Sequence, residues 1–211
     1  MPRFPVLEDD KAYIGTSLFL PRRFLAEGPI RRALTFLTDP TEEPQTLVIE
    51  HPHHLEVPRN YRTRAELLEM GLKVVDLRPR AFRRVDLEPK ANFAFKKHQL
   101  AAWEDMLDAV ENWQDFVLRL DTGRGKTVMG WRLAAEIQAP VLVISAQGAH
   151  LHTWEEELRL WFEFNGTIGW IAKKKMEYDC DIVFCTIQTL AKRLDAGALP
   201  RDFGRHFGLT I

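Results

Sequence analysis

The sequence predicts an α/β fold, with a parallel sheet flanked by helices in residues 91–211 and a small α+β domain in residues 1–90. Three observations support this division. From residue 95 onward, short apolar runs alternate with segments of helical periodicity, which is the pattern of a parallel sheet covered on both faces. Before residue 90, prolines and arginines are denser and apolar runs are shorter. The polar stretch Glu88–Asn92 is the expected linker.

The first domain is expected to contain three strands and one helix. Strands are predicted at 13–20 and 46–50, because both are apolar and end near Pro21 and Pro52. A short helix is predicted at 63–70, ended by Gly71, and a third strand at 72–77.

The second domain is expected to alternate helices and strands. Its first helix carries the apolar positions Leu100, Trp103, Met106, Leu107 and Val110. A short buried strand is predicted at 116–120. The remaining predictions are helices at 127–138, 151–162 and 188–194, and strands at 141–145, 167–171, 181–186 and 207–211. Right-handed crossovers should connect the parallel strands.

The composition excludes several classes of protein. The formal net charge of −1 gives no global basic field that would attract nucleic acid. The two cysteines, Cys180 and Cys185, are too few for a disulfide framework, and both are expected in buried strands. No apolar run reaches the ~20 residues of a membrane span, and no signal-peptide pattern is present. The sequence therefore predicts a soluble, intracellular protein without membrane partners.

Two groups of polar residues in the first domain are candidate sites. His51, His53 and His54 lack cysteine or acidic partners at a set spacing, so a surface turn is favoured over a metal site. Seven arginines could form a patch for DNA backbone, although acidic residues nearly balance the basic ones in residues 1–90. These arginines are Arg22, Arg23, Arg31, Arg32, Arg59, Arg62 and Arg64.

The strongest functional signal is the segment Asp121–Thr127, which reads Asp-Thr-Gly-Arg-Gly-Lys-Thr between a predicted strand and a predicted helix. Its glycines allow a tight turn whose amides converge on phosphate oxygens, and the helix N-terminus adds free donors. Lys126 can reach the outer phosphates of a nucleotide, and the Thr127 hydroxyl can hold Mg²⁺. The alternative is a flexible glycine turn. Leu120 stands where the strict phosphate-loop pattern has its first glycine.

Further segments, taken with this loop, resemble superfamily 2 helicases. Phe95–Gln99 resembles the segment that opens their motor domain, with Gln99 at the position whose amide reads adenine; on its own, Gln99 could be a surface helix residue. Val141–Trp154 resembles the next motif, with Ala146-Gln147 in place of Pro-Thr, and Trp154 is expected to belong to the core. Asp181–Leu190 resembles the segment whose threonine, here Thr186, contacts a strand phosphate; Thr186 could equally be an N-cap.

The resemblance covers roughly residues 93–211 and implies the first RecA-like domain of a phage or bacterial DEAD/DEAH-type DNA helicase. It implies ATP and Mg²⁺ as cofactors, single-stranded or branched DNA as partner, and the cytoplasm of a bacterial or phage-infected cell. The implied contacts to ATP come from Gln99, Thr122, Gly123, Arg124, Gly125, Lys126 and Thr127. Lys126 is the expected catalytic group. The turn Lys173–Lys175 could touch phosphate or be an ordinary solvated turn.

Phe207–Ile211 resembles the strand that leads into the Asp-Glu-x-His motif, and the sequence ends before those acids. In the family these carboxylates position Mg²⁺ and the attacking water. The chain is therefore expected to bind ATP but to hydrolyse it poorly, as a fragment, truncated gene or piece of a split enzyme. It could associate with the missing helicase half, or with itself through the exposed C-terminal strand.

Two other functions were considered. One is a non-catalytic nucleotide- or DNA-binding module, which a stop codon after Ile211 would favour. The other is an unrelated P-loop kinase, which Gln99 and the Thr186 segment disfavour.

Overall fold

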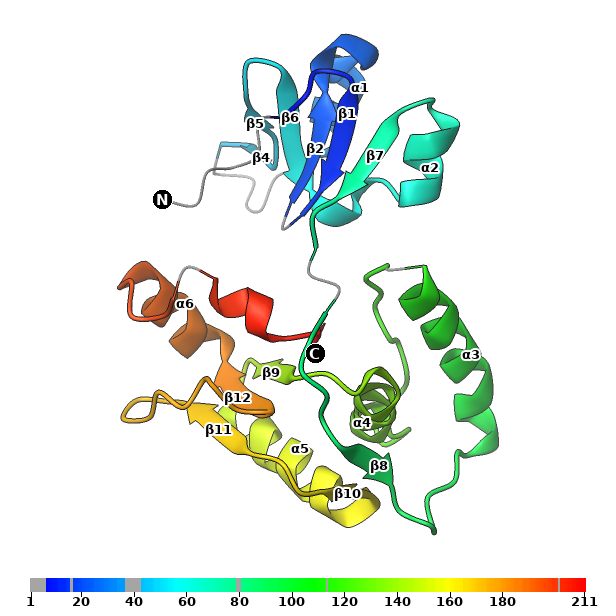
Figure 1. Cartoon of the computed structure of the whole chain (residues 1–211), viewed down its shortest axis with the longest axis vertical. Coiled ribbons are helices and arrows are strands. Elements are labelled where there is room, and N and C mark those ends of the chain that lie inside the picture. Colours follow the sequence, from blue (N-terminus) through cyan, green and yellow to red (C-terminus); the bar gives the residue numbers. More distant parts are fainter. Residues whose placement is uncertain (1–6, 16, 37–42, 79–80, 113, 201) are drawn as a thin grey trace. The chain divides into compact units, whose positions relative to one another are not determined.

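The computed structural model describes residues 7–15, 17–36, 43–78, 81–112, 114–200 and 202–211. The chain divides into two compact units, Met1–Arg78 and Pro79–Ile211, which are described separately (Figure 1). This division falls twelve residues earlier than the boundary expected at residue 90. The reason is that Val85 and Leu87 are buried in the core of the second unit.

The first unit is built on a five-stranded sheet with the order β5-β6-β2-β1-β7. Its strands are β1 (Lys11–Ile14), β2 (Ser17–Pro21), β5 (Ile49–Glu50), β6 (His54–Pro58) and β7 (Lys73–Asp76). The helices are α1 (Glu27–Ala33) and α2 (Arg64–Glu69), with 3-10 turns at Arg22–Phe24 and Arg59–Tyr61, and β3 (Thr35–Phe36) pairs with β4 (Gln45–Thr46). This is the α+β architecture that the sequence predicts.

Two strand predictions in this unit were wrong in detail. The segment 13–20 is not one strand: β1 and β2 pair antiparallel, with Ile14 opposite Leu18. The segment 46–50 is divided between β4 and β5, which belong to different sheets. The first segment contains a reversal of chain direction between Ile14 and Ser17, and the second contains a change from one sheet to another between Thr46 and Ile49. The helix at 63–70 is confirmed, and its Thr63 forms a capping box with Glu66.

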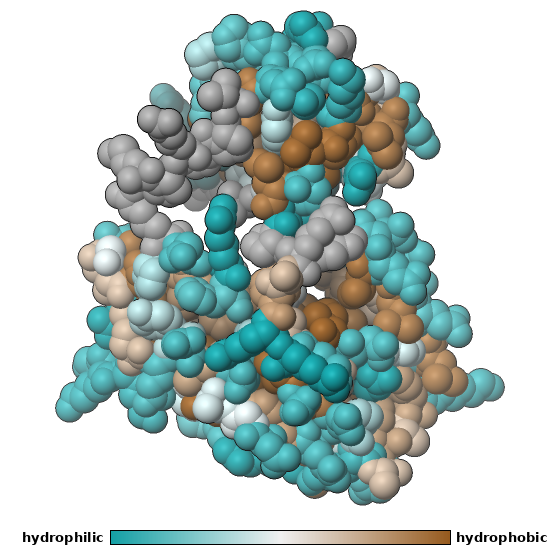
Figure 2. All heavy atoms as spheres, viewed as in Figure 1, coloured by the Kyte–Doolittle hydropathy of each residue, from teal (hydrophilic) through white to brown (hydrophobic). Residues whose placement is uncertain are grey.

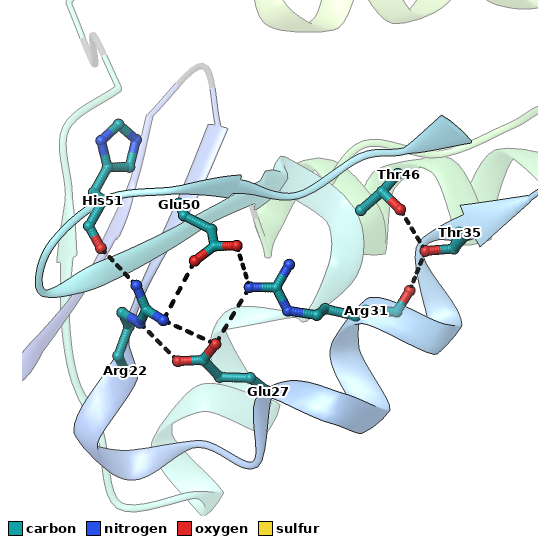
Figure 3. Close-up of polar contacts among 7 residues, drawn as sticks. All are labelled: Arg22, Glu27, Arg31, Thr35, Thr46, Glu50 and His51. Atoms are coloured by element: carbon teal, nitrogen blue, oxygen red, sulfur yellow. Dashed lines mark hydrogen bonds and ion pairs between the residues drawn. The ribbon is translucent and has the colours of Figure 1, made fainter. Parts of the chain in front are cut away.

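Ion pairs neutralise part of the predicted arginine patch. Arg22 and Arg31 both contact the carboxylates of Glu27 and Glu50, with Arg22 Nε 2.6 Å from Glu27 Oε1 (Figure 3). The Arg22 guanidinium holds the pKa of the Glu27 carboxyl below its usual value. These arginines therefore tie α1 to β5, which makes them structural residues rather than open phosphate ligands.

The three histidines take separate protein partners. The His54 side chain is buried and its Nε2 lies 3.2 Å from the Lys11 carbonyl oxygen. His51 lies 2.9 Å from Glu56 Oε2, and His53 lies 3.5 Å from Asp9 Oδ2. Within the described part of the chain, no cluster of His, Cys, Asp and Glu could hold a metal ion.

The second unit is a parallel sheet with helices on both faces, as predicted. Its four strands have the order β11-β12-β9-β13 and all pair in parallel. The strands β11, β12 and β9 are labelled in Figure 1. They are β9 (Val141–Ser145), β11 (Ile168–Ile171), β12 (Ile182–Thr186) and β13 (Leu209–Thr210). A separate ladder joins β8 (Leu87–Pro89) to β10 (Phe162–Phe164).

Alternate residues of the strands bury opposite faces of this sheet. Val141, Val143 and Phe184 pack with side chains of α4 (Lys126–Ile137) and α5 (Gly148–Trp161). Leu142 and Val183 pack on the other side with α6 (Ile187–Asp195) and the 3-10 turn Phe203–His206. The remaining helix, α3 (Lys97–Glu111), packs on α4 through Met106, Met129 and Leu133. Polar residues cover most of the visible face of each unit (Figure 2).

Two predictions for this unit need correction. Residues 116–120 form no strand, and Val117 is 93% exposed. Leu118 and Leu120 pack beside Leu209 in the same apolar cluster, but no ladder joins this segment to β13. A strand requires a hydrogen-bonding neighbour as well as apolar side chains. Cys185 is buried in β12 as expected, whereas Cys180 is half-buried and precedes that strand.

The described residues contain no helix that is long and apolar enough to cross a membrane.

Candidate nucleotide-binding site

The glycine-containing loop adopts a backbone shape that other residues disfavour. Gly123 has a φ of +76° and Gly125 a φ of +81°, both in the left-handed region. Gly125 is also the N-cap residue of α4, so the loop leads directly into the helix. The sequence prediction of a tight glycine turn followed by a helix is confirmed at this position.

Gln99 supports the back of this loop. Its side chain is 4% exposed, its Nε2 donates to the Arg124 carbonyl oxygen at 3.1 Å, and its Oε1 accepts from the Lys96 amide at 2.8 Å. Both functions of the amide are therefore used within the protein, between the start of α3 and the loop. Contact with an adenine edge would require the amide to exchange these bonds.

Lys126 is the first residue of α4, and its side chain is exposed. Its Nζ donates to the carbonyl oxygens of Leu120 at 2.8 Å and Asp121 at 3.1 Å, so the ammonium group lies across the entry of the loop. No side chain caps the helix, and the amides of its first turn have no intrahelical acceptor. The positive end of the helix dipole and the ammonium group thus meet at one place.

An open hollow of about 400 Å³ lies beside the loop. It is lined by His98, Arg119, Leu120, Asp121 and Arg124. His98 Nε2 lies 3.3 Å from the Arg124 carbonyl oxygen. The sequence gives no role to His98, Arg119 or Asp121, although each lies within a segment that it indicates: Phe95–Gln99, residues 116–120 and Asp121–Thr127.

The residues at this site fit a phosphate chain with a bound divalent cation. The exposed loop residues Thr122 and Gly123 offer backbone amides, whereas the Arg124 amide donates to the Asp121 carbonyl oxygen at 3.2 Å. Lys126 and Arg124 supply positive charge, with Arg124 Nε 4.0 Å from Asp121 Oδ2. Thr127, half-buried in the first turn of α4, supplies a hydroxyl oxygen, a ligand type that suits Mg²⁺. Amide donors, positive charge and a hydroxyl oxygen together are the groups that suit an anion with a bound cation.

The Gly125→Ala substitution should weaken binding of a fluorescent ATP analogue about tenfold or more. A Cβ there would lie 2.5 Å from Gln99 Nε2, in addition to the cost of a positive φ. Gly197→Ala is the matched control, because Gly197 has a φ of +62° and no atom within 4 Å of the added Cβ. Fluorescence titration of both variants tests this. Parent-like affinity in Gly125→Ala would contradict it.

Thr186 lies at the carboxyl end of β12. It is the N-cap of α6: its Oγ1 accepts from the Thr189 amide at 3.4 Å and donates to Thr189 Oγ1 at 2.9 Å. The neighbouring strand ends at Ser145, which pairs in register with Thr186. The N-cap role is therefore present in the structure, and a phosphate contact stays a prediction.

Trp154 belongs to the core, as expected. Its ring packs on Gly130, where an added Cβ would lie 2.6 Å from Cη2, and meets the Trp131 ring edge to face at a centroid distance of 5.4 Å. Its carbonyl oxygen accepts from Trp131 Nε1 at 2.8 Å. These contacts join α4 to α5 and so fix the helix that begins at the loop.

A parallel sheet covered on both faces, with a glycine loop that opens a helix through Gly125 and Lys126, defines a P-loop protein of RecA-like fold. Residues 92–209 match the family described as type III restriction enzyme, res subunit. The chain belongs to this family, which is of the superfamily 2 helicase type.

The chain is also similar to the probable helicase D10 of Escherichia phage T5. The two are 32% identical over 144 residues, which is 67% of this chain and 30% of the phage protein. The chain therefore spans less than a third of the length of that relative.

Proposed function

We propose that this chain supplies the ATP-binding part of a DNA-dependent ATPase that moves on or unwinds DNA. The observation that carries the proposal is the loop at residues 122–127: two glycines with positive φ, an uncapped helix N-terminus and an exposed lysine occur together. The helicase type of the family and the phage relative favour nucleic acid as the partner over a kinase substrate.

In this proposal each loop residue has one task. Amides of Thr122, Gly123 and Gly125 hold phosphate oxygens, as at other helix N-termini that bind anions. The Arg124 amide joins them by exchanging its bond to the Asp121 carbonyl oxygen. Lys126 neutralises charge on the outer phosphates by exchanging its bonds to the Leu120 and Asp121 carbonyl oxygens for phosphate oxygens. Thr127 holds Mg²⁺, which when bound screens negative charge on the phosphates.

Gln99 is proposed to read the adenine base. Because its amide oxygen and nitrogen bond to Lys96 and Arg124 in this structure, base contact and loop support compete for the same group. Binding of the base would then change the support of the loop at Arg124. This exchange would link recognition of the base to the shape of the phosphate site.

The nucleic-acid contact is proposed at the carboxyl edge of the sheet, where Thr186 opens α6. Ligands bind preferentially at this edge of open parallel sheets. A hydroxyl beside a helix N-terminus can donate to a phosphate oxygen without reading the base. This contact suits single-stranded or branched DNA, whose backbone is accessible.

The proposal is tested by measuring the affinity of the full chain for a fluorescent ATP analogue while single-stranded DNA is titrated in. DNA should change the affinity for the analogue, and the analogue should change the affinity for labelled DNA by the same factor, since coupling between two ligands is reciprocal. Omission of Mg²⁺ is the control for metal dependence. Absence of any coupling between ATP and DNA would contradict the motor assignment.

The alternative is a module that binds nucleotide and DNA without turnover. The same measurements separate the two functions. Reciprocal coupling between the ATP analogue and DNA favours the motor, whereas independent binding of the two ligands favours the module.

A further inference from the structure

A lysine-rich turn follows β11 at the carboxyl edge of the sheet. The Ala172 amide donates to the Lys175 carbonyl oxygen at 3.1 Å, and the Lys175 amide donates to the Ala172 carbonyl oxygen at 3.3 Å. A bridge between Ile171 and Met176 closes the base of the turn. Lys173, Lys174 and Lys175 are all exposed. The turn therefore has a defined backbone that presents three consecutive cations.

Arg193 fastens this turn to α6. Its Nη2 donates to the carbonyl oxygens of Lys173 at 3.0 Å and Ala172 at 3.3 Å. Arg193 is half-buried in the last turn of the helix, beside the exposed Lys192. The guanidinium thus holds the turn against the helix whose first turn begins at Thr186.

The pairing of β11 with β12 places the turn next to Thr186. Ile171 is opposite Cys185 in the parallel ladder, so the residues that follow them, Ala172 and Thr186, leave the sheet side by side. Adjacent strands lie about 4.8 Å apart. The lysines and the Thr186 hydroxyl are consequently on the same edge of the sheet, within the span of a few phosphates of one strand.

The charges on this edge are largely uncompensated. Among the described residues, Lys173 and Lys174 make no ion pair, and Lys175 lies 3.9 Å from Glu177 at the outer limit of a salt bridge. The chain as a whole carries a net charge of −1, so this cluster is a local feature and not part of a basic surface overall.

We infer that the basic turn, Lys173–Lys175 with Lys192 of α6, binds the phosphate backbone of a single nucleic-acid strand that continues past Thr186. This inference rests on the proposed function and adds to it a phosphate-binding surface outside the motif around Thr186. The turn positions the strand by charge alone, because lysine ammonium groups at the backbone carry no base information. The hydrogen bonds from Arg193 hold the turn in place before nucleic acid binds. Less conformational entropy is therefore lost on binding than with a flexible loop.

The test is a salt series of DNA binding with the Lys173→Ala/Lys174→Ala double variant. Anisotropy of a fluorescein-labelled oligothymidylate should show binding weakened roughly tenfold or more near 0.1 M salt. The slope of log affinity against log salt should flatten by about 1.4, at ~0.7 per phosphate contact on a single strand. Affinity for a fluorescent ATP analogue should be unchanged. Lys173→Arg/Lys174→Arg should restore the slope.

The matched control is Arg84→Ala/Arg159→Ala, which also removes two positive charges, but from other exposed positions of the same unit. Its salt slope should remain that of the parent. Equal losses in the two double variants, or a parent-like slope in Lys173→Ala/Lys174→Ala, would overturn the inference. If the parent bound the ATP analogue but no DNA at any salt concentration, the proposed nucleic-acid function itself would fail.

Discussion

Lys126→Ala should weaken binding of a fluorescent ATP analogue by about ten- to hundredfold. Lys126 is exposed at the start of α4, and its ammonium group bonds only to the carbonyl oxygens of Leu120 and Asp121 among the described residues. A hydrogen bond to a charged group contributes about 1.5–3 kcal/mol, and each 1.4 kcal/mol is tenfold in affinity. Fluorescence titration of the full chain with Mg²⁺ present measures the effect.

The loss of affinity in Lys126→Ala should be specific for ligands that carry the outer phosphates. The variant should bind an AMP analogue nearly as well as the parent does, because the lysine is proposed to contact the outer phosphates. Lys97→Ala is the control, since Lys97 is also an exposed lysine in the first turn of a helix of this unit. Equal affinity for the ATP analogue in Lys126→Ala and the parent would end the assignment of this loop as the phosphate site.

The loop could be predicted from sequence because its chemistry is local. Gly123 and Gly125 occupy left-handed positions, and Lys126 begins a helix, all within a few consecutive residues. The sequence also indicates Gln99 as a site residue, but not its contact with Arg124, which lies 25 residues further along the chain. That contact depends on how α3 packs on α4, and no motif or periodicity specifies it. The hollow beside the loop could not be predicted either, because its lining joins His98 of α3 to residues 119–124.

The parallel sheet was predictable because buried strands in α/β proteins are continuous apolar runs, as β9 and β12 are. The segment 116–120 is also mostly apolar, with Arg119 as its one charged residue, yet it has no ladder partner among the described strands and remains largely exposed. Apolar character alone therefore does not distinguish a central strand from an extended segment. A strand also needs a neighbouring strand to bond to, and that neighbour is distant in sequence and so is not visible in a short stretch of residues.

The boundary between the units was misplaced for a related reason. Residues 79–90 are rich in arginine and proline and read as a continuation of the first domain. In the structure the Val85 amide donates to the Gln138 carbonyl oxygen, and β8 pairs with β10, more than 70 residues later in the chain. Two long-range contacts outweigh the local composition, so the segment belongs to the second unit.

Trp131→Ala should destabilise the second unit by about 3–5 kcal/mol, the range for truncating a large buried aromatic residue. Trp131 of α4 is fully buried against α5 and β12, where its ring meets Trp154 and Phe184 edge to face. Its Nε1 donates to the Trp154 carbonyl oxygen, which would lose a partner. Urea unfolding followed by tryptophan fluorescence measures the loss, because all six tryptophans lie in Pro79–Ile211.

Trp131→Phe separates the two contributions. It keeps an aromatic ring in the cavity but removes the Nε1 donor, so it should cost about 1–3 kcal/mol, less than the alanine variant. Trp103→Phe is the control, because it also removes one tryptophan but at a half-buried position on α3. A midpoint for Trp131→Ala equal to that of the parent would show that α4 is not held by this contact. The positioning of Gly125 and Lys126 would then need another explanation, since both depend on where α4 begins.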